Sequence, residues 1–185
     1  DIGTGAWTAL TQIAADALEA PIDRIRLGIG DAMFPAASVA GGSSGTASWG
    51  GTIIAAARAF RADHGEHPSP GAQTEAQAPA DPEAENLALY SFGAHFAEVR
   101  ISADTGEIRV SRMLGVFSAG RIINPRTARS QFLGGMTMGL GMALHEQSVL
   151  DPLFGIFVNH DLAEYHIPTN ADVLDMEALW IEDQD

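Results

Sequence analysis

The sequence contains neither cysteine nor lysine, and each absence excludes a class of chemistry. Without cysteine the chain can form no disulfide, no thiolate metal site and no iron–sulfur ligation, and it has no thiol nucleophile. Without lysine it cannot carry the Gly-Lys-Ser/Thr phosphate loop of nucleotide-hydrolysing enzymes. The missing cysteines also leave the redox compartment of the protein undetermined.

Positive charge is scarce in this chain. The 10 basic residues are all arginine and face 24 aspartates and glutamates, which gives a net charge of −14. Nucleic acids and anionic membranes repel such a chain, so we expect neither as a partner. No segment approaches the roughly 20 consecutive apolar residues of a membrane helix, and no signal peptide is visible at the start. We therefore expect no membrane insertion.

What is present is an ordinary globular composition, 46% hydrophobic over 185 residues, with one interruption. Residues 63–86 are rich in proline and alanine and contain no large apolar side chain, which predicts a linker or a disordered loop. The sequence thus predicts a first part over residues 1–62 and a second part over residues 87–185.

The first part is expected to contain two helices and a strand. Apolar residues at helical spacing predict a helix over residues 4–20, with Thr4 as its N-cap. The alternation of isoleucine and leucine over residues 22–31 predicts a half-buried strand. A second helix is predicted over residues 47–62.

The second part is expected to combine a hairpin, a helix and a last strand. Alternating runs over residues 91–103 and 107–119, joined by a turn at Gly106, predict a β-hairpin. A helix is predicted from about Arg126, and a strand at residues 176–183. Helices and antiparallel strands without repeated βαβ units predict an α+β fold, with helices packed on antiparallel or mixed sheets.

Glycine-rich stretches precede both helices of the first part. Residues 3–8, "GTGAWT", lack the third glycine of a dinucleotide-binding fingerprint. This stretch and residues 41–48, "GGSSGTAS", each lie at the start of a predicted helix. Both therefore have unpaired N–H groups there, which attract anions. A simpler interpretation is that each stretch is a flexible loop whose serine or threonine caps the helix. The sequence does not decide between this interpretation and anion binding.

No other motif points to catalysis. Glycines recur in residues 134–141, "GGMTMGLG", where each costs roughly 1 kcal/mol of helix stability; this pattern favours close packing of the helix. His160, Asp161 and His166 fit no familiar metal-ligand spacing, and no serine lies in a G-x-S-x-G elbow. We expect no metal ligands and no catalytic triad.

Four segments taken together, at residues 1–18, 41–50, 90–151 and 159–173, resemble a known family. They begin "DIGTGAWT", "GGSSGTAS", "YSFGAHFAEV" and "NHDLAEYHIPT". In this order they are similar to the molybdenum-binding subunit of the xanthine dehydrogenase and aldehyde oxidase family, above all to the separate large subunits of bacterial three-subunit enzymes. Relatives usually carry a longer piece where residues 63–86 stand.

The resemblance implies a cofactor: molybdenum held by molybdopterin, in bacteria usually as the cytosine dinucleotide. The pterin holds the metal, so the protein needs no metal ligands of its own. The resemblance implies that the cofactor is bound by the residues at the matching positions, which are Gly3, Thr4, Gly5, Thr46, Ala47, Ser48 and Met138. Two of these depart from the family, because glutamine is common at the positions of Thr4 and Met138.

The resemblance also implies the chemistry and the partners. The family hydroxylates aldehydes or N-heterocycles with oxygen from water, and electrons leave through iron–sulfur and FAD subunits. The catalytic glutamate of the family lies in a Gly-Glu-x-Gly motif beyond the equivalent of Asp185. We therefore expect no catalytic residue here, a chain that works with the remainder of its own large subunit and is inactive alone, and a cytoplasmic or periplasmic location.

Two other functions remain compatible with the residues. An accessory or vestigial domain would keep the fold for packing against partner subunits, and the departures at Thr4 and Met138 favour it. A general anion- or nucleotide-binding module would use the two glycine-rich helix starts without preference for cytosine.

Overall fold

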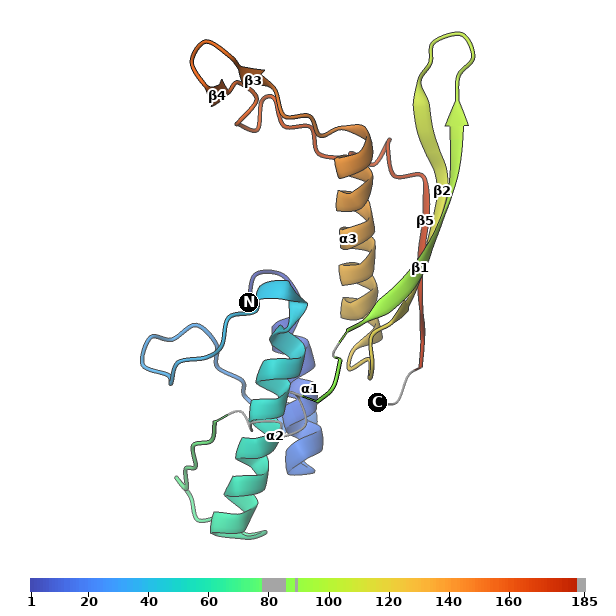
Figure 1. Cartoon of the computed structure of the whole chain (residues 1–185). Helices are drawn as coiled ribbons and strands as arrows, with labels where there is room; N and C mark the ends of the chain where they lie inside the picture. Colours follow the sequence, from blue (N-terminus) through green and yellow to red (C-terminus); the bar gives the residue numbers. More distant parts are fainter. Residues whose placement is uncertain (78–85, 89, 183–185) are drawn as a thin grey trace. The chain divides into compact units, whose positions relative to one another are not determined.

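The computed structural model describes residues 1–77, 86–88 and 90–182, so part of the predicted linker, residues 78–85, lies outside the described residues. The chain forms two compact units (Figure 1). The first comprises Asp1–Leu89 with Ile123–Thr127, and the second comprises Tyr90–Ile122 with Ala128–Asp185. In the described part of the chain no helix is long and apolar enough to cross a membrane.

The first unit is built on two packed helices, as predicted. Helix α1 spans Ala6–Leu18 and helix α2 spans Gly45–His64. The core is small and consists of Ala6, Leu10 and Ile13 of α1, with Trp49, Ile53, Leu27, Ile29 and Ile123 packed against it. Gly50 permits the close contact between the helices, because a Cβ there would lie 2.7 Å from Ile13 Cδ1.

The strand predicted over residues 22–31 is wrong. Ile22–Arg24 form a short 3-10 helix, η1, in which the Arg24 N–H donates to the Pro21 carbonyl. The residues that follow alternate between half-buried and exposed, and Leu27 and Ile29 reach the core. The alternation therefore reports which side chains face the core, but in the described residues no neighbouring strand completes a ladder with this segment.

The second unit is built on a three-stranded mixed sheet. Its strands are β1 (Phe92–Ile101), β2 (Ile108–Ser118) and β5 (Asp175–Ile181), in the order β1-β2-β5. Strands β1 and β2 form the predicted antiparallel hairpin, and β5 runs parallel to β2. The turn depends on Gly106, whose φ of 73° is in the left-handed region that favours glycine.

Helix α3, Pro125–Leu144, packs on one face of this sheet, which confirms the predicted helix and the α+β class. The Phe132 ring stacks on the Phe117 ring of β2 with centroids 4.4 Å apart. The Thr137 hydroxyl oxygen, which donates to the Leu133 carbonyl within α3, lies 3.6 Å from the sulfur of Met176 on β5. Proline suits the first position of a helix because the N–H that it lacks would have no partner there.

A small antiparallel pair, β3 (Leu150–Asp151) and β4 (Ile156–Phe157), follows α3. η2, Gly41–Ser43, directly precedes α2 in the first unit. The remaining segments that the structure describes are loops and turns.

Candidate anion-binding site

The start of α1 is shaped by two glycines with positive φ. Gly5 is the N-cap at φ 81°, and Gly3 lies at φ 96°. A Cβ on Gly5 would lie 2.5 Å from Thr127 Cγ2, so both the backbone conformation and the close approach require glycine at this position. A Cβ on Gly3 would meet nothing within 4 Å.

The carboxylate of Asp1 occupies the N–H groups of this helix start. Its Oδ1 accepts from the Gly3 N–H at 2.8 Å and from the Thr4 N–H at 3.1 Å, and its Oδ2 accepts from the Trp7 N–H at 3.2 Å. The predicted capping by Thr4 is wrong, because no side chain caps α1 at Gly5 and Asp1 bonds these amides instead. An aspartate before a glycine loop was the sequence signal for this role. The loop therefore holds an anion, supplied here by its own chain.

The start of α2 differs because, in the part of the chain that the structure describes, several of its donors have no recorded acceptor. Gly42 and Ser43 adopt positive φ, and Ser44 is an N-cap that makes no side-chain cap bond. The first helical N–H bond recorded is that of Ser48 to the Ser44 carbonyl, at 2.9 Å. Within the described residues no acceptor is recorded for the Thr46 and Ala47 N–H groups or for the hydroxyls of Thr46 and Ser48. Thr46 and Ala47 are exposed, and Ser48 is half-buried.

The two helix starts lie at the same end of the helix pair. Arg61, near the end of α2, bonds the end of α1: its Nη1 lies 3.0 Å from Glu19 Oε1 and its Nη2 donates to the Leu18 carbonyl at 2.7 Å. Nearer the starts, Gly50 approaches Ile13. The helices therefore run parallel. The N-terminal dipoles of both helices thus favour negative charge at one end of the first unit.

This arrangement groups six of the seven predicted cofactor residues, Gly3, Thr4, Gly5, Thr46, Ala47 and Ser48. Met138 belongs to the second unit, where it lies on α3 with 43% of its surface exposed. The helix surface near Met138 has open space at its glycines, because a Cβ on Gly134, Gly135 or Gly139 would meet nothing within 4 Å. The predicted close packing of these glycines applies to Gly141, where a Cβ would lie 2.9 Å from Pro168 Cδ.

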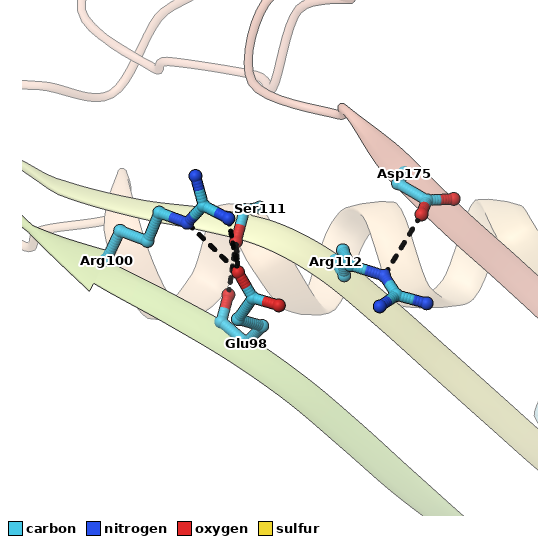
Figure 2. A network of polar contacts seen from close by, with 5 residues as sticks. All are labelled: Glu98, Arg100, Ser111, Arg112 and Asp175. Atoms are coloured by element: carbon cyan, nitrogen blue, oxygen red, sulfur yellow. Dashed lines mark hydrogen bonds and ion pairs between the residues drawn. The ribbon is translucent and has the colours of Figure 1, made fainter.

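A second polar cluster lies on the sheet, away from these residues in sequence. Figure 2 shows the Glu98 carboxylate pointing toward Arg100 and Ser111, and Arg112 reaching Asp175. Glu98 Oε1 accepts from Arg100 Nη2 at 2.7 Å and from the Ser111 hydroxyl at 2.8 Å. The Ser111 hydrogen bond, followed by that of Arg100, holds the pKa of the Glu98 carboxyl below its usual value.

The described residues contain no cluster of three or more histidines, cysteines, aspartates and glutamates that could hold a metal ion. What the first unit offers is chemistry for binding: backbone N–H groups, the hydroxyls of Thr46 and Ser48, and two helix dipoles. These donors suit phosphate or pyrophosphate oxygens.

Comparison with known proteins agrees with a cofactor-binding role. A family model described as "Molybdopterin cofactor-binding domain" matches residues 1–70 and 63–174. The aldehyde oxidoreductase molybdenum-binding subunit PaoC of Escherichia coli K12 is 38% identical over an alignment of 213 positions, which covers 100% of this chain and 29% of PaoC. This alignment is longer than the 185 residues, so PaoC has additional residues within the aligned region. The putative xanthine dehydrogenase molybdenum-binding subunit XdhA of the same organism is 34% identical over 50% of this chain and 12% of its own length.

Solved structures show the same fold. The aldehyde oxidoreductase from Desulfovibrio desulfuricans superposes with a TM-score of 0.77 at 24% identity, covering 99% of this chain and 22% of that one. A Cu,Mo-CO dehydrogenase gives a TM-score of 0.72 at 19% identity, covering 99% of this chain and 28% of that one. The chain thus spans under a third of the length of these relatives. From the family model and the identity to PaoC, we conclude that the chain belongs to the molybdopterin cofactor-binding domain family, as found in molybdenum-binding subunits of aldehyde oxidoreductases and xanthine dehydrogenases.

Proposed function

We propose that this chain forms part of the cofactor site of a molybdenum hydroxylase and that the two helix starts bind the phosphate-bearing end of a molybdopterin cytosine dinucleotide. The observation that supports this most directly is the parallel pairing of α1 and α2, with both glycine-rich starts at one end. Gly3, Thr4, Gly5, Thr46, Ala47 and Ser48 are the residues concerned, and Met138 is the proposed contact in the second unit.

The residues present fit such a group. The Asp1 carboxylate already occupies amides at the start of α1, so this loop accommodates an anionic ligand. At the start of α2 no acceptor within residues 1–77, 86–88 and 90–182 is recorded for the Thr46 and Ala47 N–H groups, which can therefore donate to a ligand, and the Thr46 and Ser48 hydroxyls can donate to further oxygens. When bound, the cofactor would supply the metal-centred redox chemistry of hydroxylation, while these residues hold and orient its phosphates.

The relatives support a proposal about the substrate and the partners. PaoC is named an aldehyde oxidoreductase and matches over the whole chain, so we favour aldehydes over N-heterocycles as substrates. We further propose that iron–sulfur and FAD subunits accept the electrons, and that the remainder of a large subunit completes the substrate pocket and supplies the catalytic glutamate.

Calorimetric titration of this chain with CDP and with inorganic phosphate tests the site. We expect CDP to bind more tightly than phosphate, and Thr46→Val to weaken CDP binding about tenfold, because a hydrogen bond to a charged group is lost. Thr11→Val is the matched control, since the Thr11 hydroxyl donates to the Trp7 carbonyl within α1. Equal affinity for CDP and phosphate would support a general anion-binding module instead.

The enzymatic part of the proposal is tested on the complete large subunit, expressed with cofactor maturation. We expect bound molybdenum by mass spectrometry and CMP released by acid. A subunit that holds neither would favour an accessory domain without cofactor.

A further inference from the structure

The start of α3 belongs to the first unit, although it follows the β1–β2 hairpin in the chain. Residues Ile123–Thr127 group with Asp1–Leu89, and Ile123 packs against the core of this unit. The first turn of α3 is therefore anchored beside α1, the helix whose start holds the Asp1 carboxylate.

Asn124 joins this turn to α1 with both ends of its side-chain amide. Its Oδ1 accepts from the N–H groups of Arg126 at 3.1 Å and Thr127 at 3.0 Å, which caps α3. Its Nδ2 donates to Gln12 Oε1 of α1 at 2.8 Å, and both residues of this pair are half-buried. A cap requires only an acceptor, which aspartate would also supply. The N–H of the amide therefore has a second role, which is to hold α3 to α1.

Thr127 connects this attachment to the glycine loop of α1. Its hydroxyl donates to the Asn124 carbonyl at 3.2 Å, and its Cγ2 lies 2.5 Å from the position that a Cβ on Gly5 would take. Because one torsion angle orients both branches of threonine, the hydroxyl bond also holds the methyl group against the Gly5 backbone. Gly5 is the N-cap of α1, and the amides of Gly3 and Thr4 lie directly before it. The contact therefore restrains the backbone that aims these two donors.

The starts of α1 and α3 differ in the residue that accepts from their amides. At α1 the acceptor is Asp1, an exposed residue that an anionic ligand can displace. At α3 the acceptor is Asn124, which would also lose its bond to Gln12 if it moved away. The start of α3 is therefore closed to a ligand and supports the start of α1.

We propose that Asn124 is a positioning residue for the anion-binding site at the start of α1. By bonding Gln12 it keeps Thr127 packed against Gly5, so the loop before Gly5 keeps the direction of its amides. Donors that are held in place before binding need not be ordered on binding, which raises the affinity for the ligand. This inference rests on the proposed function, because the ligand is the phosphate-bearing end of the same cofactor.

Calorimetric titration of the whole chain with CDP tests this role. Asn124→Ser keeps a capping oxygen, but its shorter side chain cannot reach Gln12, and we expect CDP affinity to fall about threefold to tenfold. Gln12→Leu removes the same bond from the other side and is expected to give a similar loss. Because both changes act through one bond, the double variant should bind about as tightly as the weaker single variant. Affinities equal to that of the unchanged chain, or losses that add, would overturn the proposal.

Asn159→Ser is the matched control. Asn159 also uses both ends of its amide, since its Oδ1 accepts from the Val149 N–H at 3.0 Å and its Nδ2 donates to the Gln147 carbonyl, but it belongs to the second unit. We expect this variant to change CDP affinity less than about twofold. An equal loss in Asn159→Ser and Asn124→Ser would contradict the assigned role, because the effect would not be specific to Asn124.

Amide hydrogen exchange of the chain without ligand gives a readout that does not depend on CDP. We expect Asn124→Ser to accelerate exchange at Gly3 and Thr4 and to leave Ala57, which is buried in α2, unchanged. Acceleration at Ala57 as large as at Gly3 would show a general loss of stability, and unchanged exchange at Gly3 and Thr4 would show that Asn124 does not hold the loop. Either result overturns the positioning role. If the unchanged chain binds no CDP, the proposed function fails, and these exchange rates alone decide whether Asn124 positions the loop.

Discussion

At the scale of single residues, Asp1 competes with any anion for the start of α1. Its carboxylate accepts from the amides of Gly3, Thr4 and Trp7. Removing it with Asp1→Ala should free these donors, so we expect tighter CDP binding by calorimetry, by about threefold or more. The same change removes the capping of α1 and should lower the free energy of unfolding by about 1 kcal/mol.

The matched control is Asp23→Ala, which removes the same charge from an exposed position in η1. If Asp23→Ala tightened CDP binding as much as Asp1→Ala, the effect would come from net charge and not from the freed amides.

Alanine substitutions of Gly3 and Gly5 would distinguish the cost of backbone strain from the cost of a steric clash. Both have positive φ, but only at Gly5 would a Cβ meet another residue, Thr127. We expect Gly3→Ala to destabilise the fold by about 1 kcal/mol and Gly5→Ala by about 2–4 kcal/mol, because a clash is added to the strain. Denaturant unfolding measures both, and equal losses would show that the contact with Thr127 relaxes without cost.

At the scale of elements, the Glu98 network ties acid sensitivity to the β1–β2 hairpin. The pKa of the Glu98 carboxyl is lowered by the Ser111 and Arg100 hydrogen bonds, so the ionised form of Glu98 is favoured in the folded state. The resulting stabilisation is present above the ordinary glutamate pKa and is lost as the pH falls through the lowered value. We expect amide exchange in the hairpin, corrected for intrinsic rate, to accelerate on acidification, and Glu98→Gln to reduce this pH dependence.

Glu107→Gln provides the comparison, because Glu107 also bonds an arginine, Arg109, on the same hairpin. The acid response should persist in this variant. An unchanged response in Glu98→Gln would contradict the assigned role of Glu98.

The elements that the sequence predicts are those with local determinants. Gly106 specifies a turn between alternating runs, and Pro125 marks a helix start, so the hairpin and α3 appear where expected. The strand predicted over residues 22–31 is wrong because a strand needs a neighbouring strand to pair with. The alternation of apolar residues contains no information about such a neighbour. The same limit applies to the helix starts: glycine and serine predict donors, but the parallel pairing of α1 and α2 depends on contacts between distant residues. The role of Asp1 depends on residues only two to six positions away, so the aspartate before the glycine loop could have indicated it.

At the scale of the whole molecule, the net charge of −14 repels the anionic ligand that the helix starts are proposed to bind. The dipoles at the starts of α1 and α2 act over the first turn only, whereas the net charge repels an approaching nucleotide over the Debye length, about 30 Å at 10 mM salt and about 8 Å at 150 mM. Added salt should therefore remove the repulsion more than the attraction. We expect the association rate of a fluorescent CDP analogue, measured by stopped flow, to rise severalfold between these salt concentrations. Fluorescent cytidine without phosphates, the control, should associate at a rate that salt does not change. A CDP association rate that falls with salt would indicate that local positive potential, and not the net charge, governs approach to the site.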